Sequence, residues 1–351
     1  MRGFFMAANP VLARSVRGNW VENLHRGAIC VADAEGRVLA SVGDIDRDIF
    51  PRSAIKAVQA VALLRSGAVE RFGYSAPAIA LACASHNGEP AHTELAAAML
   101  AAADLDETAL ECGIHPPIDP AARKALFAAG GKPGTLHNAC SGKHAGMLAV
   151  ARALGIELEG YSRADHPVQI AVRQRVEEIL DHPLTEGKCG TDGCSIPTWA
   201  APLRRFAQGF ARMATGTGLS PETAAAARTI FDAATRHPFL VGGTGSFDTE
   251  IMAAFGDRLM IKFGADGVYC GALRDSGIGF ALKCDDGSVP AATAMVAALL
   301  LSIAEPDAAQ KSLLQSRARR LQHSWSGQDV GWLEATPDVD TEHVLRERPL
   351  S

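Results

Sequence analysis

The sequence has little that would indicate a membrane, nucleic-acid-binding or disulfide-stabilised protein. Its eight cysteines are spread over 351 residues, which is not the disulfide framework of a small secreted domain. The longest apolar run, residues 291–304, is too short to span a bilayer, and the run within residues 1–10 is too short for a secretion signal. The net charge of -5 provides no basic excess for nucleic acid or an anionic membrane. We therefore expect a soluble cytoplasmic protein that binds neither.

The chain instead has the composition of a well-packed globular protein, with 48% hydrophobic and 21% charged residues. We expect one catalytic unit over residues 1–351, of the α+β class. Sheet-forming regions at roughly 11–50 and 255–290 flank a mainly helical middle, which predicts an antiparallel sheet packed against helices. The remaining segment, 306–351, shows no clear pattern. Strands are predicted at 26–31, 37–42, 79–83, 259–264, 267–272 and 279–283. Helices are predicted at 53–66, 93–103, 121–128, 167–180, 203–214 and 290–304. One further helix is expected to end near residue 154, and another to begin at residue 220.

Ser53 and Lys56 stand three residues apart at the start of an apolar helix. Positions i and i+3 share one face of a helix, so the lysine amine could reach the serine hydroxyl. This pattern suits a serine nucleophile activated by a neutral lysine. The alternative is an ordinary N-cap serine followed by a surface lysine, and on spacing alone this alternative is favoured.

Two later motifs favour the catalytic interpretation. Ser85-x-Asn87 and Lys262-x-Gly264 follow in the order found in penicillin-binding proteins and serine β-lactamases, which the chain resembles in this respect. The second serine can relay a proton, and the later lysine supplies positive charge. Gly264 would allow a ligand to approach the strand closely. The gap between the first two motifs is shorter than in the lactamases.

A third cluster contains possible metal ligands. Cys140 is followed by Lys143 and His144, and Cys194 lies further along the chain. Zinc prefers thiolate, imidazole or carboxylate, so the residue types alone favour His144 or Cys189 as the third ligand. Lysine binds a metal only when it is neutral. The alternative is a set of buried cysteines that bind no metal.

Taken together, these blocks resemble the class 3, or rhizobial-type, L-asparaginases of the asparaginase II family. The resemblance covers most of residues 20–300. It is carried by VENLHRG (21–27), PRSAIK (51–56), SHNGE (85–89), NACSGKH (138–144), CGTDGC (189–194) and KFGADGV (262–268).

The resemblance implies a fold similar to that of serine β-lactamases and glutaminases, a homodimer, and two Ser–Lys pairs. These pairs are Ser53 with Lys56 and Ser85 with Lys262. Asp266 stands where glutamate is commoner in the family, and Phe263 follows the second lysine. The family pattern also implies a zinc ion bound by Cys140, Lys143 and Cys194, with Arg52, Asn87, His144 and Asp192 lining the substrate site.

The expected reaction is hydrolysis of L-asparagine, a small amide, to L-aspartate and ammonia. Ser53 is the favoured nucleophile because helical spacing fixes its lysine, although the sequence does not decide between Ser53 and Ser85. Zinc is expected to orient substrate or stabilise loops. The alternatives are a glutaminase, a β-lactam-binding serine hydrolase, or a non-enzymatic zinc-binding protein.

Overall fold

The computed structural model describes residues 8–339, so residues 1–7 of the short N-terminal apolar run lie outside it. Its main element is an eight-stranded antiparallel sheet with the order β11-β12-β1-β2-β10-β9-β8, in which β3 also pairs with β2. Two small sheets pair β4 with β7 and β5 with β6. The strands are β1 (Val11–Arg17), β2 (Trp20–Ala32), β3 (Val38–Val42), β4 (Asp48–Ile49), β5 (Cys189–Thr191), β6 (Pro197–Trp199), β7 (Ala201–Pro202), β8 (Leu259–Gly264), β9 (Val268–Leu273), β10 (Ile278–Cys284), β11 (Arg319–His323) and β12 (Asp329–Ala335).

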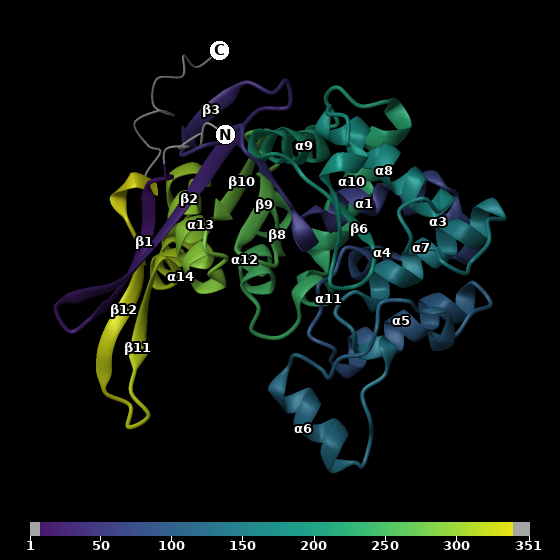
Figure 1. Ribbon diagram of the computed structural model, residues 1–351, viewed down its shortest axis with the longest axis horizontal. Coiled ribbons are helices and arrows are strands. Elements are labelled where there is room, and N and C mark those ends of the chain that lie inside the picture. The colour runs from purple at the N-terminus through teal and green to yellow at the C-terminus, as the bar shows by residue number, and fades with distance from the viewer. Residues whose placement is uncertain (1–7, 340–351) are drawn as a thin grey trace, which may run out of the picture.

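The helical middle of the chain forms one side of the molecule and the sheet forms the other (Figure 1). Segments from both ends of the sequence therefore lie side by side in one sheet. The helices are α1 (Lys56–Gln59), α2 (Val61–Arg65), α3 (Ala68–Phe72), α4 (Ala76–Ala82), α5 (Pro90–Ala102), α6 (Pro120–Ala128), α7 (Ser141–Leu154), α8 (Pro167–Leu180), α9 (Leu203–Thr215), α10 (Pro221–Arg236), α11 (Pro238–Gly242), α12 (Phe247–Phe255), α13 (Val289–Ile303) and α14 (Ala308–Ala318).

The centre of the sheet is buried on both faces. All residues of β9 are buried, and so are most of those in β10, which requires cover on each side. Helices α9 and α13 both pack against these strands. Gly279 of β10 makes the approach of α9 possible, because a Cβ there would collide with the Ala207 carbonyl. Lys262 lies on β8, which pairs with this buried part of the sheet through β9.

Most of the predicted elements are confirmed, including the antiparallel pairing of β2 with β3 and of β8, β9 and β10. The predicted strand at 79–83 is wrong, because residues 76–82 form α4. A short apolar run that is buried on every side does not distinguish strand from helix. The sheet also includes β11 and β12, which lie in the segment that showed no clear pattern.

Candidate active site

Ser53 lies in a tight turn that leads into the buried helices. The turn is a 3-10 helix, Arg52–Ile55, with Pro51 as its N-cap, so Ser53 lies near the start of the helix as expected but is not itself the cap. The turn packs directly on β8. A Cβ on Gly264 would lie only 2.5 Å from the Pro51 carbonyl oxygen. Gly264 therefore makes room for the turn, and not for a ligand as the sequence indicated.

Arg52 fixes the backbone immediately before Ser53. Its φ of 50° lies in the left-handed region, which costs a non-glycine residue about 1–3 kcal/mol. Its guanidinium donates to Asp192 at 3.0 Å and forms a second ion pair with Asp266. Burial acts to raise the pKa of Asp192, but the Gly193 N–H and the Arg52 charge outweigh it and keep the pKa low. Two carboxylates from distant parts of the chain thus hold the turn through Arg52.

The Ser85 hydroxyl lies between two buried lysine amines. Lys56 Nζ is 2.9 Å from Ser85 Oγ, and Lys262 Nζ is 3.1 Å from it. Ser85 follows α4, and its N–H donates to the Val241 carbonyl at 2.9 Å. The lysines come from α1 and β8 and are only 1% and 2% exposed. The structure therefore brings three of the four predicted catalytic residues into direct contact, and it contains the predicted contact between Ser85 and Lys262.

The predicted contact between Ser53 and Lys56 is not formed. Within residues 8–339, the Ser53 hydroxyl makes no hydrogen bond, and the Lys56 amine is directed to Ser85, Cys140 and the Ala84 carbonyl. Side chains at i and i+3 of a 3-10 turn nevertheless eclipse one another. Rotation of Ser53 about χ1 between its staggered positions changes the direction in which its hydroxyl points. Ser53 is partly exposed, as a nucleophile must be.

Asp248 is a buried partner of Lys262 that the sequence analysis missed. Its Oδ2 lies 3.5 Å from Lys262 Nζ and accepts from the Phe263 N–H at 2.8 Å. Burial lowers the pKa of Lys262 to about 8, with Asp248 opposing this and Lys56 adding to it. Burial also raises the pKa of Asp248. No motif marks Asp248, because it occupies an ordinary position in the first turn of α12 after the N-cap Ser246.

The predicted metal ligands form a second cluster that adjoins the lysines. Lys143 Nζ lies 3.0 Å from Cys194 Sγ, and Lys56 Nζ lies 3.1 Å from Cys140 Sγ. The Cys194 thiol and the nearby ammonium groups lower the pKa of Cys140 well below its usual range. Burial lowers the pKa of Lys143, but the two cysteines outweigh it and raise the pKa. The two thiols, once deprotonated, and the Lys143 amine, once neutral, would offer a donor set that suits a thiophilic divalent ion, with the ion replacing their protons.

His144 and Asn87 have other partners. His144 is fully buried and pairs through Nδ1 with the Tyr161 hydroxyl at 2.6 Å, while its Nε2 has no partner among residues 8–339. Burial, followed by the nearby lysines, lowers the pKa of His144 well below its usual range. Asn87 donates to the Thr244 carbonyl at 3.0 Å. In this structure the Asn87 amide holds a loop.

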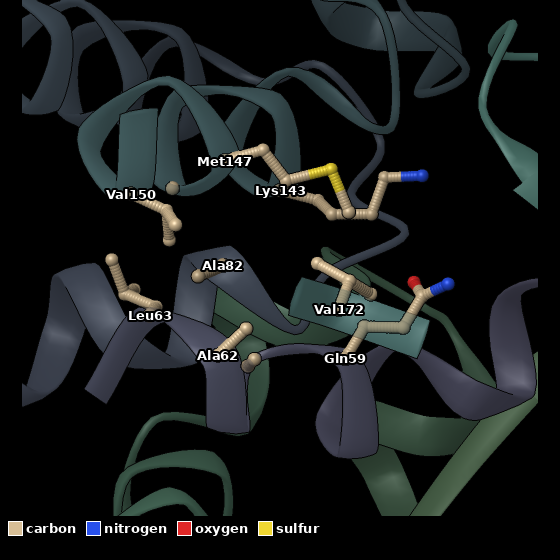
Figure 2. A pocket seen from close by; sticks show the side chains of 10 residues that line it. Gln59, Ala62, Leu63, Ala82, Lys143, Met147, Val150 and Val172 are labelled. Atoms are coloured by element: carbon tan, nitrogen blue, oxygen red, sulfur yellow. The ribbon is translucent and has the colours of Figure 1, made fainter. Parts of the chain in front are cut away.

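A small cavity beside Lys143 is distinct from this site (Figure 2). Its volume is about 10 Å³, which is space for about one water molecule. Its wall is mainly apolar and includes Leu63, Ala82 and Val150. In Figure 2 the Lys143 amine lies at the end of its side chain away from Leu63 and Val150. The cavity is a packing gap between helices and has no room for a substrate.

Comparison with known proteins gives one extended match. A family model described as L-asparaginase II matches residues 13–335. No curated protein matches the chain. Similar solved structures include Mglu in its native form, at 16% identity and a TM-score of 0.41 over 75% of this chain. The chain covers 60% of the length of Mglu. Another is a beta-lactamase from Mycobacterium bovis, at 15% identity and a TM-score of 0.36 over 75% of this chain and 88% of that one.

Proposed function

The chain belongs to the L-asparaginase II family, and on that premise we propose that it hydrolyses L-asparagine to L-aspartate and ammonia. The observation that carries the proposal is the Ser85 hydroxyl in contact with both Lys56 and Lys262. Two amines on one hydroxyl form a path along which a proton can move between them. Such a path suits amide cleavage, in which a proton leaves the attacking hydroxyl and another reaches the departing nitrogen.

In the proposed reaction Ser53 attacks the side-chain amide carbon. Its oxygen bonds to that carbon to give a tetrahedral intermediate, and its proton passes to the Lys56 amine. The carbon–nitrogen bond then breaks, ammonia leaves with a proton delivered from Lys262 through Ser85, and an ester on Ser53 remains. Water attacks the ester, its hydroxyl stays on the carboxyl group of the released L-aspartate, and its other proton returns to the Ser53 oxygen. The proton held by Lys56 passes through Ser85 to Lys262, which restores both amines.

Ser85 is the second candidate for the nucleophile. Its two direct lysine contacts favour it, whereas Ser53 requires a change of rotamer to reach Lys56. Catalytic hydrogen bonds often shorten only when substrate binds, so the contacts in the free protein do not decide between the two serines, and both are tested by substitution.

The two charges beside Ser53 fit the two charged groups of the substrate backbone. Arg52 is positioned to bind the α-carboxylate, and Asp192 the α-ammonium. Both are held by their mutual ion pair at 3.0 Å before substrate arrives, which lowers the ordering cost of binding. We include Asn87 and His144 among the residues lining the site, with Asn87 acting through the Thr244 loop.

The family pattern also leads us to propose a zinc ion held by Cys140, Lys143 and Cys194. When bound, zinc would supply fixed positive charge beside the lysines. Cys140 also contacts the Lys56 amine at 3.1 Å. A fixed position of Cys140 would therefore help to hold the Lys56 amine in place. Zinc and substrate would thus bind to neighbouring parts of one site.

A homodimer is also proposed. The hairpins β1–β2 and β11–β12 project from the rest of the molecule (Figure 1). Both carry exposed large apolar side chains. Trp20 is 82% and Leu24 55% exposed, and Trp325 at the tip of the second hairpin is fully exposed. Exposed aromatic and aliphatic side chains of this kind are common in protein–protein interfaces.

Separate assays on one preparation distinguish the proposed function from its alternatives. Ammonia release is measured with L-asparagine and with L-glutamine, and nitrocefin cleavage is followed in parallel, each with and without chelator. The asparaginase proposal predicts release from L-asparagine at the highest kcat/KM. A preference for L-glutamine would identify a glutaminase, and cleavage of nitrocefin alone a β-lactam hydrolase. Zinc binding with no turnover of any substrate would identify a binding protein.

A further inference from the structure

A second group of metal-ligating side chains lies apart from the two clusters of the candidate active site. Among residues 8–339, the ligand atoms of His25, Cys284 and Asp286 all lie within 4.8 Å of one another. His25 Nδ1 is 2.7 Å from Asp286 Oδ2, and Cys284 Sγ donates to Asp286 Oδ1 at 3.0 Å. Imidazole, thiolate and carboxylate are the ligand types that zinc most often uses in proteins.

The sheet brings these residues together from opposite ends of the sequence. Cys284 is the last residue of β10 and pairs with Gly27 of β2, two residues beyond His25. Asp286 follows in a turn that is fixed by the Asp285 N–H on the Arg26 carbonyl at 2.8 Å. The cluster is therefore built on paired strands and a hydrogen-bonded turn, which hold ligands more firmly than a free loop.

Burial in the cluster is graded from inside to outside. Cys284 is fully buried, the His25 side chain is 13% exposed and the Asp286 side chain is 46% exposed. The charged group nearest in sequence, Lys283, directs its amine to the carbonyls of Asp266 and Cys284. Asp285 is occupied by Asn9 and Arg47. The cluster thus runs from the buried thiol to solvent at Asp286, where water could complete a tetrahedral shell.

We propose that His25 Nδ1, Cys284 Sγ and Asp286 form a second divalent metal site that takes zinc or cobalt with three protein ligands and one water. Binding releases the proton that the thiol now donates to the carboxylate. Without metal, burial and Asp286 raise the pKa of Cys284 to about 12, so the thiol is unreactive. The proposal does not depend on the proposed hydrolase activity.

The position of the cluster gives this site a structural consequence. The Cys284 N–H donates to the Gly267 carbonyl at 2.8 Å, and a Cβ on Gly267 would lie 2.9 Å from the Cys284 Cβ. Gly267 follows Asp266, whose carboxylate pairs with Arg52. A metal at Cys284 therefore stabilises the β8–β9 turn, which holds Arg52 beside Ser53 through Asp266.

The test is cobalt titration of the full-length, chelator-stripped, reduced protein, read through the thiolate-to-cobalt charge-transfer band and by bound metal per chain. Cys194→Ser removes a ligand of the other cluster, so that cobalt bound at His25, Cys284 and Asp286 can be measured by itself. We expect Cys194→Ser to bind one cobalt with a single-thiolate band, and Cys194→Ser/Cys284→Ser to lose it. In the same background, His25→Ala, at the partly exposed rim, should weaken binding at least about 10-fold.

The control is Cys194→Ser/Cys270→Ser, which removes a buried cysteine of β9 outside the cluster and should still bind one cobalt. The proposal is overturned if Cys194→Ser binds no cobalt, or if cobalt bound to Cys194→Ser is unaffected by His25→Ala. Because the readout is metal content, a protein without asparaginase activity would still give a clear result.

Discussion

Asp248→Asn removes the carboxylate that faces the Lys262 amine while keeping the side-chain shape. The remaining amide oxygen can still accept from the Phe263 N–H. At 3.5 Å, a unit charge pair contributes about 1 kcal/mol at the dielectric constant of water and about 5 kcal/mol at an effective value of about 20. With about 1.4 kcal/mol per pH unit, loss of the carboxylate lowers the pKa of Lys262 by about 1 to 3.5.

The proposed mechanism uses Lys262 as an ammonium donor, so kcat/KM should fall as pH rises through the Lys262 pKa of about 8. In Asp248→Asn this alkaline limb should move to lower pH, because a stabilising negative charge has been removed. The assay is aspartate formation from L-asparagine across the pH range. Glu250→Gln is the matched control. It removes a carboxylate from the same helix, but this carboxylate pairs with Arg317 and not with Lys262. An alkaline limb that stays in place in Asp248→Asn, or moves upward, would refute this account of Lys262.

Three further predictions concern the nucleophile, the metal and the dimer. Ser53→Ala should lower kcat about a millionfold, because it removes the nucleophile, and Ser85→Ala about 100- to 10 000-fold, because it removes a proton relay. Acid quenching during turnover, followed by peptide mass spectrometry, should locate the aspartyl ester on Ser53. An ester on Ser85 would exchange the two roles. Chelation should raise KM more than it lowers kcat, with recovery on adding zinc, and Cys194→Ser should prevent that recovery; kinetics that do not respond to chelator would reject a role for metal. Trp20→Ser with Leu24→Ser should shift sedimentation from dimer to monomer, whereas a monomeric parent protein would end the dimer proposal.

Local sequence signals predicted many of the elements that support the site. Ser220 followed by Pro221 marks the start of α10, and the Ser220 hydroxyl does accept from the Thr223 N–H. The apolar spacing of Leu203, Phe206 and Phe210 marks α9, whose buried side covers the sheet. These signals act within one or two turns of chain, so one sequence is sufficient to show them.

Contacts between distant segments were harder to predict. Spacing placed Lys56 beside Ser53, but a long side chain on a buried helix can turn to whichever polar group the fold presents, and here it reaches Ser85 and Cys140. The partnership of Asp248 with Lys262 depends on how α12 packs on β8, which no local pattern encodes. The family resemblance indicated the contact of Ser85 with Lys262, whereas the contact of Lys56 with Ser85 in place of Ser53 is evident only from the three-dimensional structure.

The rate of L-aspartate formation from L-asparagine, compared between the purified protein and Lys262→Met, decides whether the Lys262 amine takes part in amide hydrolysis. Methionine keeps the apolar stem of the buried lysine and removes the amine that contacts Ser85. The account predicts equal amounts of aspartate and ammonia from the parent protein, and a rate at least about 100-fold lower in a Lys262→Met protein whose circular dichroism is unchanged. Parent-like aspartate formation by Lys262→Met, or none by the parent protein, would contradict it.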